Sequence, residues 1–196
     1  MKNLIAAIGF PVMIIVFATG ISMTDVAGSQ SVVPQDTEIS TLISDLRDSR
    51  LREDDPERVI KAIERLGDLK ATAAVDDLIQ LIGFKRTFKW ERTDGFTHEL
   101  QPITPGNRYP AVSALFQIGK PALPALVKVI EVSESDSVES QNATYAVESI
   151  FRDDLPGGVK YLKEAATQSY TTMMAQRLST AARRLDVLSR KVSRSK

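Results

Sequence analysis

Two stretches decide the fold: AIERLGDLKATAAVDDLIQLI at residues 62–82 and AVSALFQIGKPALPALVKVI at residues 111–130. Both place apolar residues at the three- and four-residue spacing of a buried helix face, on either side of a short turn. The turn follows Gly67 in the first stretch and holds Gly119 and Pro121 in the second. Each stretch is therefore predicted to form a pair of helices joined by a short turn.

The two predicted pairs repeat one another. When their second helices are aligned, four apolar positions coincide: Val75 with Leu123, Leu78 with Leu126, Ile79 with Val127, and Ile82 with Ile130. A more degenerate third copy runs from Ala143 to Leu162, with Pro156–Gly158 as its turn, and a long apolar-striped helix follows. A single pair cannot bury both of its faces, so pairs of this kind stack on one another. We predict an all-α fold, a short α-solenoid of about three helical pairs plus end helices.

These stretches resemble HEAT repeats, particularly those of the phycobilisome-lyase type. The shared features are Ala and Leu on the first helix, Leu-Gly or Ile-Gly at its end, and Ala, Leu and Val on the second. The third copy departs from the pattern, because Phe151-Arg152 follows Ile150 where a glycine is expected. Repeats of this kind are mostly protein-binding scaffolds, so the resemblance implies that role. Phycobilisome lyases attach bilins to client proteins, but no lyase site can be carried over to this chain.

The N-terminus has the layout of a secretory signal peptide. Lys2 precedes an uncharged, largely apolar run from Leu4 to Met23, and small residues follow. The same run fits an uncleaved membrane anchor, because about 20 apolar residues span a bilayer. We predict a signal peptide or anchor at 1–28, a flexible leader at 29–36 and the repeat domain at 37–196. The chain is therefore expected to be exported to the periplasm, the cell envelope or the medium; the alternative is anchoring by an N-terminal transmembrane helix.

An insertion at residues 84–108 breaks the helical period. Aromatic and polar residues alternate there on both sides of Asp94-Gly95, which is typical of β-strands. A three-residue loop places the apolar side chains on one face and predicts a β-hairpin near 84–102. The hairpin either folds onto the solenoid or meets a partner. Its candidate protein-binding residues are Phe88, Trp90, Arg92, Phe96 and His98.

The remaining composition excludes several classes of function. The 25 basic and 25 acidic side chains cancel, so no global field attracts nucleic acid. Without cysteine there is no disulfide, thiolate metal site or cysteine nucleophile. His98 is the single histidine, and Asp54-Asp55, Asp76-Asp77 and Asp153-Asp154 are expected to be solvated helix caps and surfaces. We predict no catalytic, cofactor or metal site.

These observations predict a non-enzymatic, extracytoplasmic protein-binding or scaffold module with another protein as its partner. Basic residues are gathered in the last helix, from Arg177 to Lys196. They either form a solvated helix end, where cations are favourable, or contact an anionic envelope surface as a second partner. Two alternatives remain open at this point. One is a lyase- or chaperone-like protein acting on a client protein, and the other is a small membrane-anchored structural protein.

Overall fold

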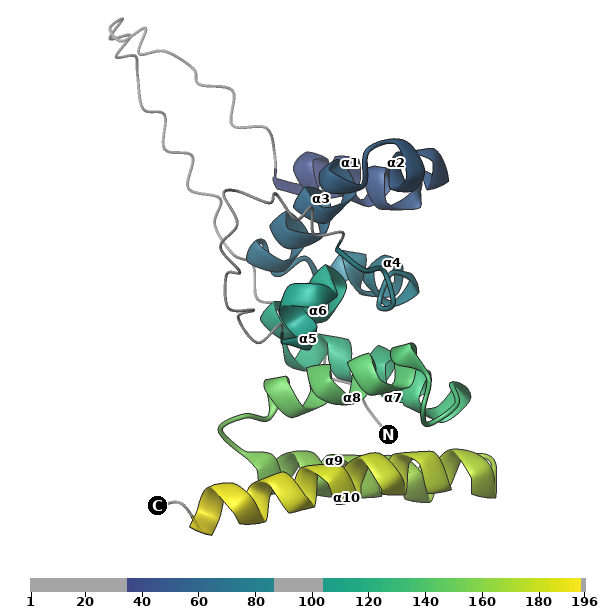
Figure 1. The fold of residues 1–196 in the computed structure, drawn as a ribbon, viewed down its shortest axis with the longest axis vertical. Helices are drawn as coiled ribbons and strands as arrows, with labels where there is room; N and C mark the ends of the chain where they lie inside the picture. The colour runs from purple at the N-terminus through teal and green to yellow at the C-terminus, as the bar shows by residue number, and fades with distance from the viewer. Residues whose placement is uncertain (1–34, 87–103, 195–196) are drawn as a thin grey trace, which may run out of the picture. The chain divides into compact units, whose positions relative to one another are not determined.

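A computed structural model describes residues 35–86 and 104–194, all within one compact unit, Val33–Lys196. The described residues form helices and connections without a strand, which confirms the all-α class (Figure 1). In chain order the helices are α1 (Gln35–Arg47), α2 (Ser49–Asp54), α3 (Pro56–Asp68), α4 (Val75–Gln80), α5 (Pro105–Arg108), α6 (Pro110–Ile118), α7 (Leu123–Val132), α8 (Val138–Ile150), α9 (Leu155–Gln168) and α10 (Thr172–Arg194). Single 3₁₀ turns, Thr72–Ala74 and Lys120–Ala122, lead into α4 and α7.

The helices pack in two rows. One row holds α3, α6 and α8, each in contact with the next, and α1 packs on α3. The other row holds α4, α7 and α10, and α9 lies alongside α10 (Figure 1). In sequence, the two predicted pairs correspond to α3 with α4 and α6 with α7, and in the structure α3 contacts α6 and α4 contacts α7.

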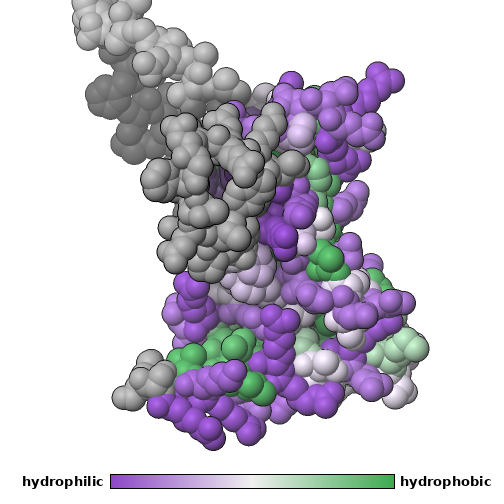
Figure 2. Space-filling view, viewed as in Figure 1, coloured by the Kyte–Doolittle hydropathy of each residue, from purple (hydrophilic) through white to green (hydrophobic). Residues whose placement is uncertain are grey.

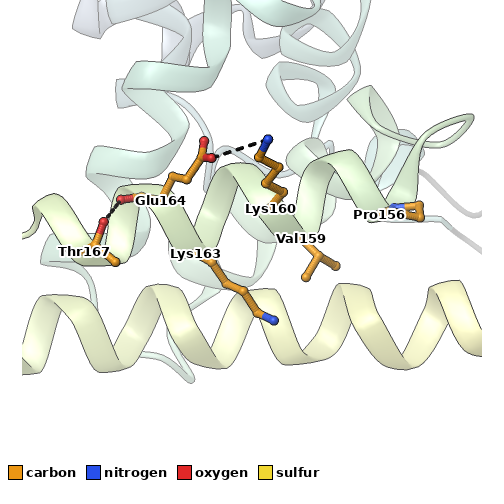
Figure 3. Close-up of a pocket in the computed structure, with 6 residues that line it drawn as sticks. All are labelled: Pro156, Val159, Lys160, Lys163, Glu164 and Thr167. Carbon is orange, nitrogen blue, oxygen red and sulfur yellow. Dashed lines mark hydrogen bonds and ion pairs between the residues drawn. The ribbon is translucent and has the colours of Figure 1, made fainter.

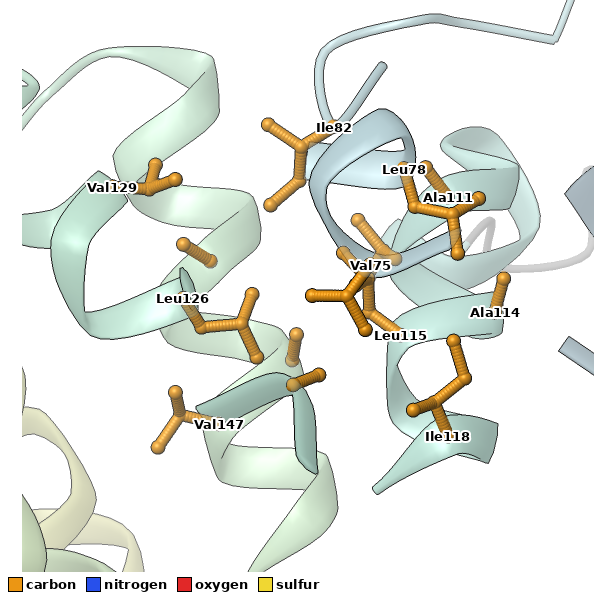
Figure 4. Close-up of a cluster of buried hydrophobic side chains, with 14 of the residues drawn as sticks. Val75, Leu78, Ile82, Ala111, Ala114, Leu115, Ile118, Leu126, Val129 and Val147 are labelled. Carbon is orange, nitrogen blue, oxygen red and sulfur yellow. The ribbon is translucent and has the colours of Figure 1, made fainter. Parts of the chain in front are cut away.

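One continuous apolar core joins these rows. Figure 4 shows Val75 and Leu78 from α4, Leu115 from α6 and Leu126 from α7 directed into the space between their helices. These side chains are at most 8% exposed, and the same cluster extends from Leu46 at the end of α1 to Leu185 in α10. Of the four aligned pairs in the two sequence repeats, three are buried in this core, and the fourth, Ile79 with Val127, packs against it half-buried.

The helical segment at the start of the domain is interrupted. Helix α1 ends at Arg47, and α2 starts at Ser49. The Asp48 side chain accepts a 2.9 Å hydrogen bond from the Arg50 N–H and so caps a new helix. At the other end α1 begins at Gln35, inside the predicted leader, with acidic residues in its first turn that favour a helix start.

Asp77 was expected on a solvated surface, and the structure corrects that expectation. Its carboxylate is 7% exposed and accepts two hydrogen bonds from Arg47, at 2.7 Å from Nε and 3.1 Å from Nη2. This bidentate pair joins α1 to α4. Spacing alone could not reveal it, because the two residues are 30 positions apart.

The turn after Gly67 is built differently from the prediction. Gly67 lies within α3 and is buried, and a Cβ there would stand 2.8 Å from the Ala114 Cα on α6. The residue with positive φ is Lys70, at 49°. The Lys70 N–H donates to the Gly67 carbonyl and the Ala71 N–H to the Leu66 carbonyl, which is the Schellman arrangement. Gly67 thus permits close helix packing, whereas Lys70 terminates the helix.

The third copy departs from the predicted pair. Pro156–Gly158 were expected to form its turn, but they lie in the first turn of α9, where the Asp154 side chain accepts from the Gly157 N–H at 3.0 Å. A Cβ on Gly158 would stand 2.9 Å from Leu185 Cδ2, so this glycine allows α9 to approach α10. Helix α7 contacts both α8 and α10, and α9 packs on α10.

Several predictions fall outside the described residues. They are the signal peptide or anchor at 1–28, most of the leader at 29–36, and hairpin positions 87–102. Of the insertion 84–108, residues 84–86 are irregular, and residues 105–108 form the short helix α5. In the described ranges, no helix combines the length and hydrophobicity that crossing a membrane requires.

Candidate functional site: the base of the insertion

The two ends of the insertion are held together. The Arg86 N–H donates a 2.9 Å hydrogen bond to the Arg108 carbonyl, which joins the incoming and outgoing chain. Phe84 comes shortly before Arg86 in the chain, and Tyr109 directly follows Arg108. Both side chains pack against the core. On the outgoing side the Thr104 hydroxyl caps α5 by accepting from the Asn107 N–H at 3.3 Å. The described residues therefore form a defined base from which residues 87–103 depart.

Helix α8 contacts the chain at the start of this base. The buried Asn142 side-chain amide donates a 2.8 Å hydrogen bond to the Ile82 carbonyl, just before the chain enters the insertion. Gly83 lies against the same helix, because a Cβ there would stand 2.9 Å from Glu139 Oε1. The starting point of the insertion is thus tied to a helix 60 residues later in the chain.

A polar pocket of about 310 Å³ lies beside the base, between α3, α5 and α6. Its lining residues are Glu64, Asp68, Arg86, Gly106, Asn107, Pro110, Ser113, Ala114 and Gln117. The Arg86 guanidinium pairs with the Glu64 carboxylate, and the Gln117 amide donates to Asp68 Oδ1 at 3.3 Å. The pairing fixes the Arg86 side chain against α3, so side-chain and backbone contacts both anchor the incoming stem.

The polar side chains of this pocket are hydrogen-bonding groups. Its two carboxylates already have partners, and amides and a serine hydroxyl make up the other polar groups. A general acid–base pair would need two groups converging on a reacting atom. Across the described part of the chain, no cluster of three or more His, Cys, Asp or Glu side chains could hold a metal ion.

The predicted contact residues are not placed by the structure. Phe88, Trp90, Arg92, Phe96 and His98 lie outside the described ranges, and only the base that bears them is described. The structure adds Glu64, Asp68, Ser113 and Gln117 to the candidate surface. A sequence signal for these existed, because both pairs have the four-residue spacing of one helix face, on α3 and on α6.

A larger hollow of about 440 Å³ lies on α9, and it is a weaker candidate. Figure 3 shows Val159 and Lys163 directed toward α10, and Lys160 facing Glu164, 3.8 Å between Nζ and Oε1. All six lining residues come from this one helix. The hollow is a shallow groove floored by aliphatic carbon, without the converging polar groups that usually mark a ligand site.

No protein-family model matches the chain, and comparisons with curated proteins and with solved structures found no match either.

Proposed function

We propose that the chain is a non-enzymatic, extracytoplasmic protein-binding module built as a short α-solenoid of HEAT-like helical pairs. The consecutive contacts of α3, α6 and α8, and of α4 and α7, support the solenoid. Three of the four aligned apolar pairs are buried, namely Val75 with Leu123, Leu78 with Leu126, and Ile82 with Ile130, which also supports it. Repeat scaffolds commonly bind partners through insertions placed on one face.

The observation that carries this proposal is the hydrogen bond between the Arg86 N–H and the Arg108 carbonyl. It joins Arg86, just before the insertion's central residues, to Arg108 at the end of α5, on a base held by Asn142 and by the Glu64–Arg86 pair. Holding the residues that flank a binding element in place lowers the ordering cost of binding. We propose that Phe88, Trp90, Arg92, Phe96 and His98 contact the partner from a hairpin on this base.

Site-specific photo-crosslinking in the source cells tests the binding proposal. A photoreactive amino acid replaces Trp90 in one variant and the α9 groove residue Lys163 in a matched control. The proposal expects one or a few discrete crosslinked species from position 90 and none of the same mass from position 163. Identical products from both positions, or none from position 90, would refute it.

Export is tested separately by mass spectrometry of the protein recovered from those cells. A mature N-terminus near Ile21 or Ser29 would indicate a cleaved signal peptide, whereas an intact Met1 would indicate the anchored alternative. Recovery of the protein from the cytoplasm with an intact N-terminus would contradict both.

The end of α10 provides a second contact surface, to an anionic envelope component. Figure 2 shows hydrophobic residues near the C-terminal end of the described chain, and Val187 and Val192 are 51% and 47% exposed. Lys191 and Arg194 lie in the last turn beside them. Apolar and basic residues together favour an anionic lipid surface. Cosedimentation with anionic vesicles, compared between the full chain and a chain lacking residues 189–196, tests this contact.

A further inference from the structure

We infer that the interface of α8 and α10 contains a binding site for a small oxyanion, a carboxylate or a phosphate group. A hollow of about 130 Å³ lies between the two helices. Arg177, Thr180, Ala181 and Arg184 line it from α10, and Ser140 and Thr144 line it from α8. The inference rests on these described residues and is independent of the insertion.

The α10 wall is two arginines with a small residue between them. Arg177 and Arg184 are seven positions apart, so they lie on one face, two turns or about 10 Å apart along the helix. Ala181 falls between them on that face and is 6% exposed. Its short side chain leaves open the space that a larger residue would fill.

Each guanidinium group is held in place by one contact. Arg177 Nη1 donates a 2.8 Å hydrogen bond to the Glu131 carbonyl at the end of α7. Arg184 Nε lies 2.7 Å from Glu148 Oε1 on α8. A guanidinium has five N–H donors, so each arginine keeps donors beyond the contact that positions it. A guanidinium group held in place in this way can donate two parallel hydrogen bonds to two oxygens of a carboxylate or phosphate.

The α8 wall contributes a buried hydroxyl and a helix N-terminus. Ser140 is 4% exposed and lines the hollow. It lies in the first turn of α8, a 13-residue helix capped by Ser137. The positive end of the helix dipole favours an anion there. A buried hydroxyl that lines a hollow beside two arginines is a donor for a bound group.

Size and charge define the ligand class. The hollow has a volume of about 130 Å³, which is enough for a carboxylate or phosphate group. The two arginines are partly offset by Glu148, which leaves a local excess of one positive charge. A single anionic group is therefore the expected occupant.

The test is a ¹H–¹⁵N NMR titration of the full-length chain with sodium acetate and, separately, sodium phosphate at constant ionic strength. We expect the amide resonances of Ser140, Thr144 and Arg184 to shift saturably. A titration with sodium chloride alone is the reference. Arg184→Gln should weaken binding about tenfold, the usual effect of losing a charge-assisted hydrogen bond. Arg190→Gln is the matched control, because Arg190 lies on the same helix, pairs with Asp186 and does not line the hollow.

Ser140→Ala provides a second variant in case Arg184→Gln alters the fold. It removes only the hydroxyl and should weaken binding several-fold while thermal unfolding stays unchanged. Tighter binding of acetate would assign the site to carboxylates, and tighter binding of phosphate to phosphate groups. The inference is overturned if neither anion shifts these amides, or if Arg190→Gln weakens binding as much as Arg184→Gln.

Discussion

The Asn142 side chain on α8 donates a buried 2.8 Å hydrogen bond to the Ile82 carbonyl at the point where the chain leaves the α4 region for the insertion. A carbonyl just past the end of a helix lacks an intrahelical partner and must find another. The buried amide supplies that partner and fixes the entry to the insertion relative to α8. This contact therefore contributes both to stability and to the position of the proposed binding element.

Replacing Asn142 with alanine should lower the free energy of unfolding by about 1–3 kcal/mol, because the buried Ile82 carbonyl is left without a donor. Gln141→Ala is the control, since Gln141 is the exposed neighbour and its side-chain amide donates to the Asp136 carbonyl. That control should change stability by less than about 0.5 kcal/mol. Urea unfolding of both variants measures the difference, and equal losses would argue that the buried bond contributes nothing.

Replacing Lys70 with glycine should stabilise the protein. Its φ of 49° is unfavourable for a side chain with a Cβ, by about 1–2 kcal/mol. Part of that gain is lost to the greater freedom of glycine in the unfolded chain, so Lys70→Gly should raise stability by about 0.5–1 kcal/mol. The same substitution at the exposed helical residue Lys61 should lower it by about 1 kcal/mol. Thermal melts showing the same sign at both positions would disprove the Schellman assignment.

Gly67 and Gly106 should respond oppositely to alanine. At Gly67 the new Cβ would stand 2.8 Å from backbone of α6, so the loss should be about 1 kcal/mol or more despite better helix propensity. At Gly106, in α5, the nearest atom to a Cβ is 3.8 Å away. Alanine fits there and should stabilise by about 0.4–1 kcal/mol through the unfolded chain. Chemical denaturation of the two variants checks the pair, and a tolerated Gly67→Ala would mean that α3 and α6 pack less closely.

Much of this fold could be predicted from the sequence because the decisive signals are local. The helical period, the Asp55 cap before Pro56 and the Gly119 turn, with φ of 80°, act over a few residues. The corrections concern contacts between distant residues. Nothing near Asp77 indicates that Arg47 will cover it, and nothing near Gly158 indicates that Leu185 will press against it. The same distance hides the Arg86–Arg108 bond at the candidate site.

Glu148 should make stability depend on pH. Burial raises the pKa of this carboxyl from its ordinary value of 4.5, and the charge of Arg184 opposes the rise. Its Oε1 lies close to Arg184 Nε but has no well-directed hydrogen bond, so burial is the larger effect. Between the ordinary and the raised pKa the folded chain binds more protons than the unfolded chain. The contribution of Glu148 to stability is thus full below 4.5 and falls as pH rises through the raised pKa.

Glu148→Gln removes this titration. Its free energy of unfolding, relative to the unmodified chain, should increase between about pH 4 and about pH 7, because only the unmodified chain must then bury a charge. Glu164→Gln, at an exposed position of α9, controls for the loss of one negative charge. Urea unfolding of both variants and of the unmodified chain at the two pH values measures these free energies. A relative stability of Glu148→Gln that decreases over this range would show that the Arg184 pair outweighs burial.

The central claim is that recognition resides in the insertion and that the helical domain serves as its support. The most direct measurement is quantitative capture from the source cell envelope by the full chain and by a variant whose residues 87–103 are replaced with a short Gly-Ser linker. Because Arg86 and Arg108 already hold the ends together, the variant should unfold at nearly the same temperature as the full chain. The account predicts that proteins enriched by the full chain are lost with the variant. Equal enrichment of those proteins by a folded variant would contradict it.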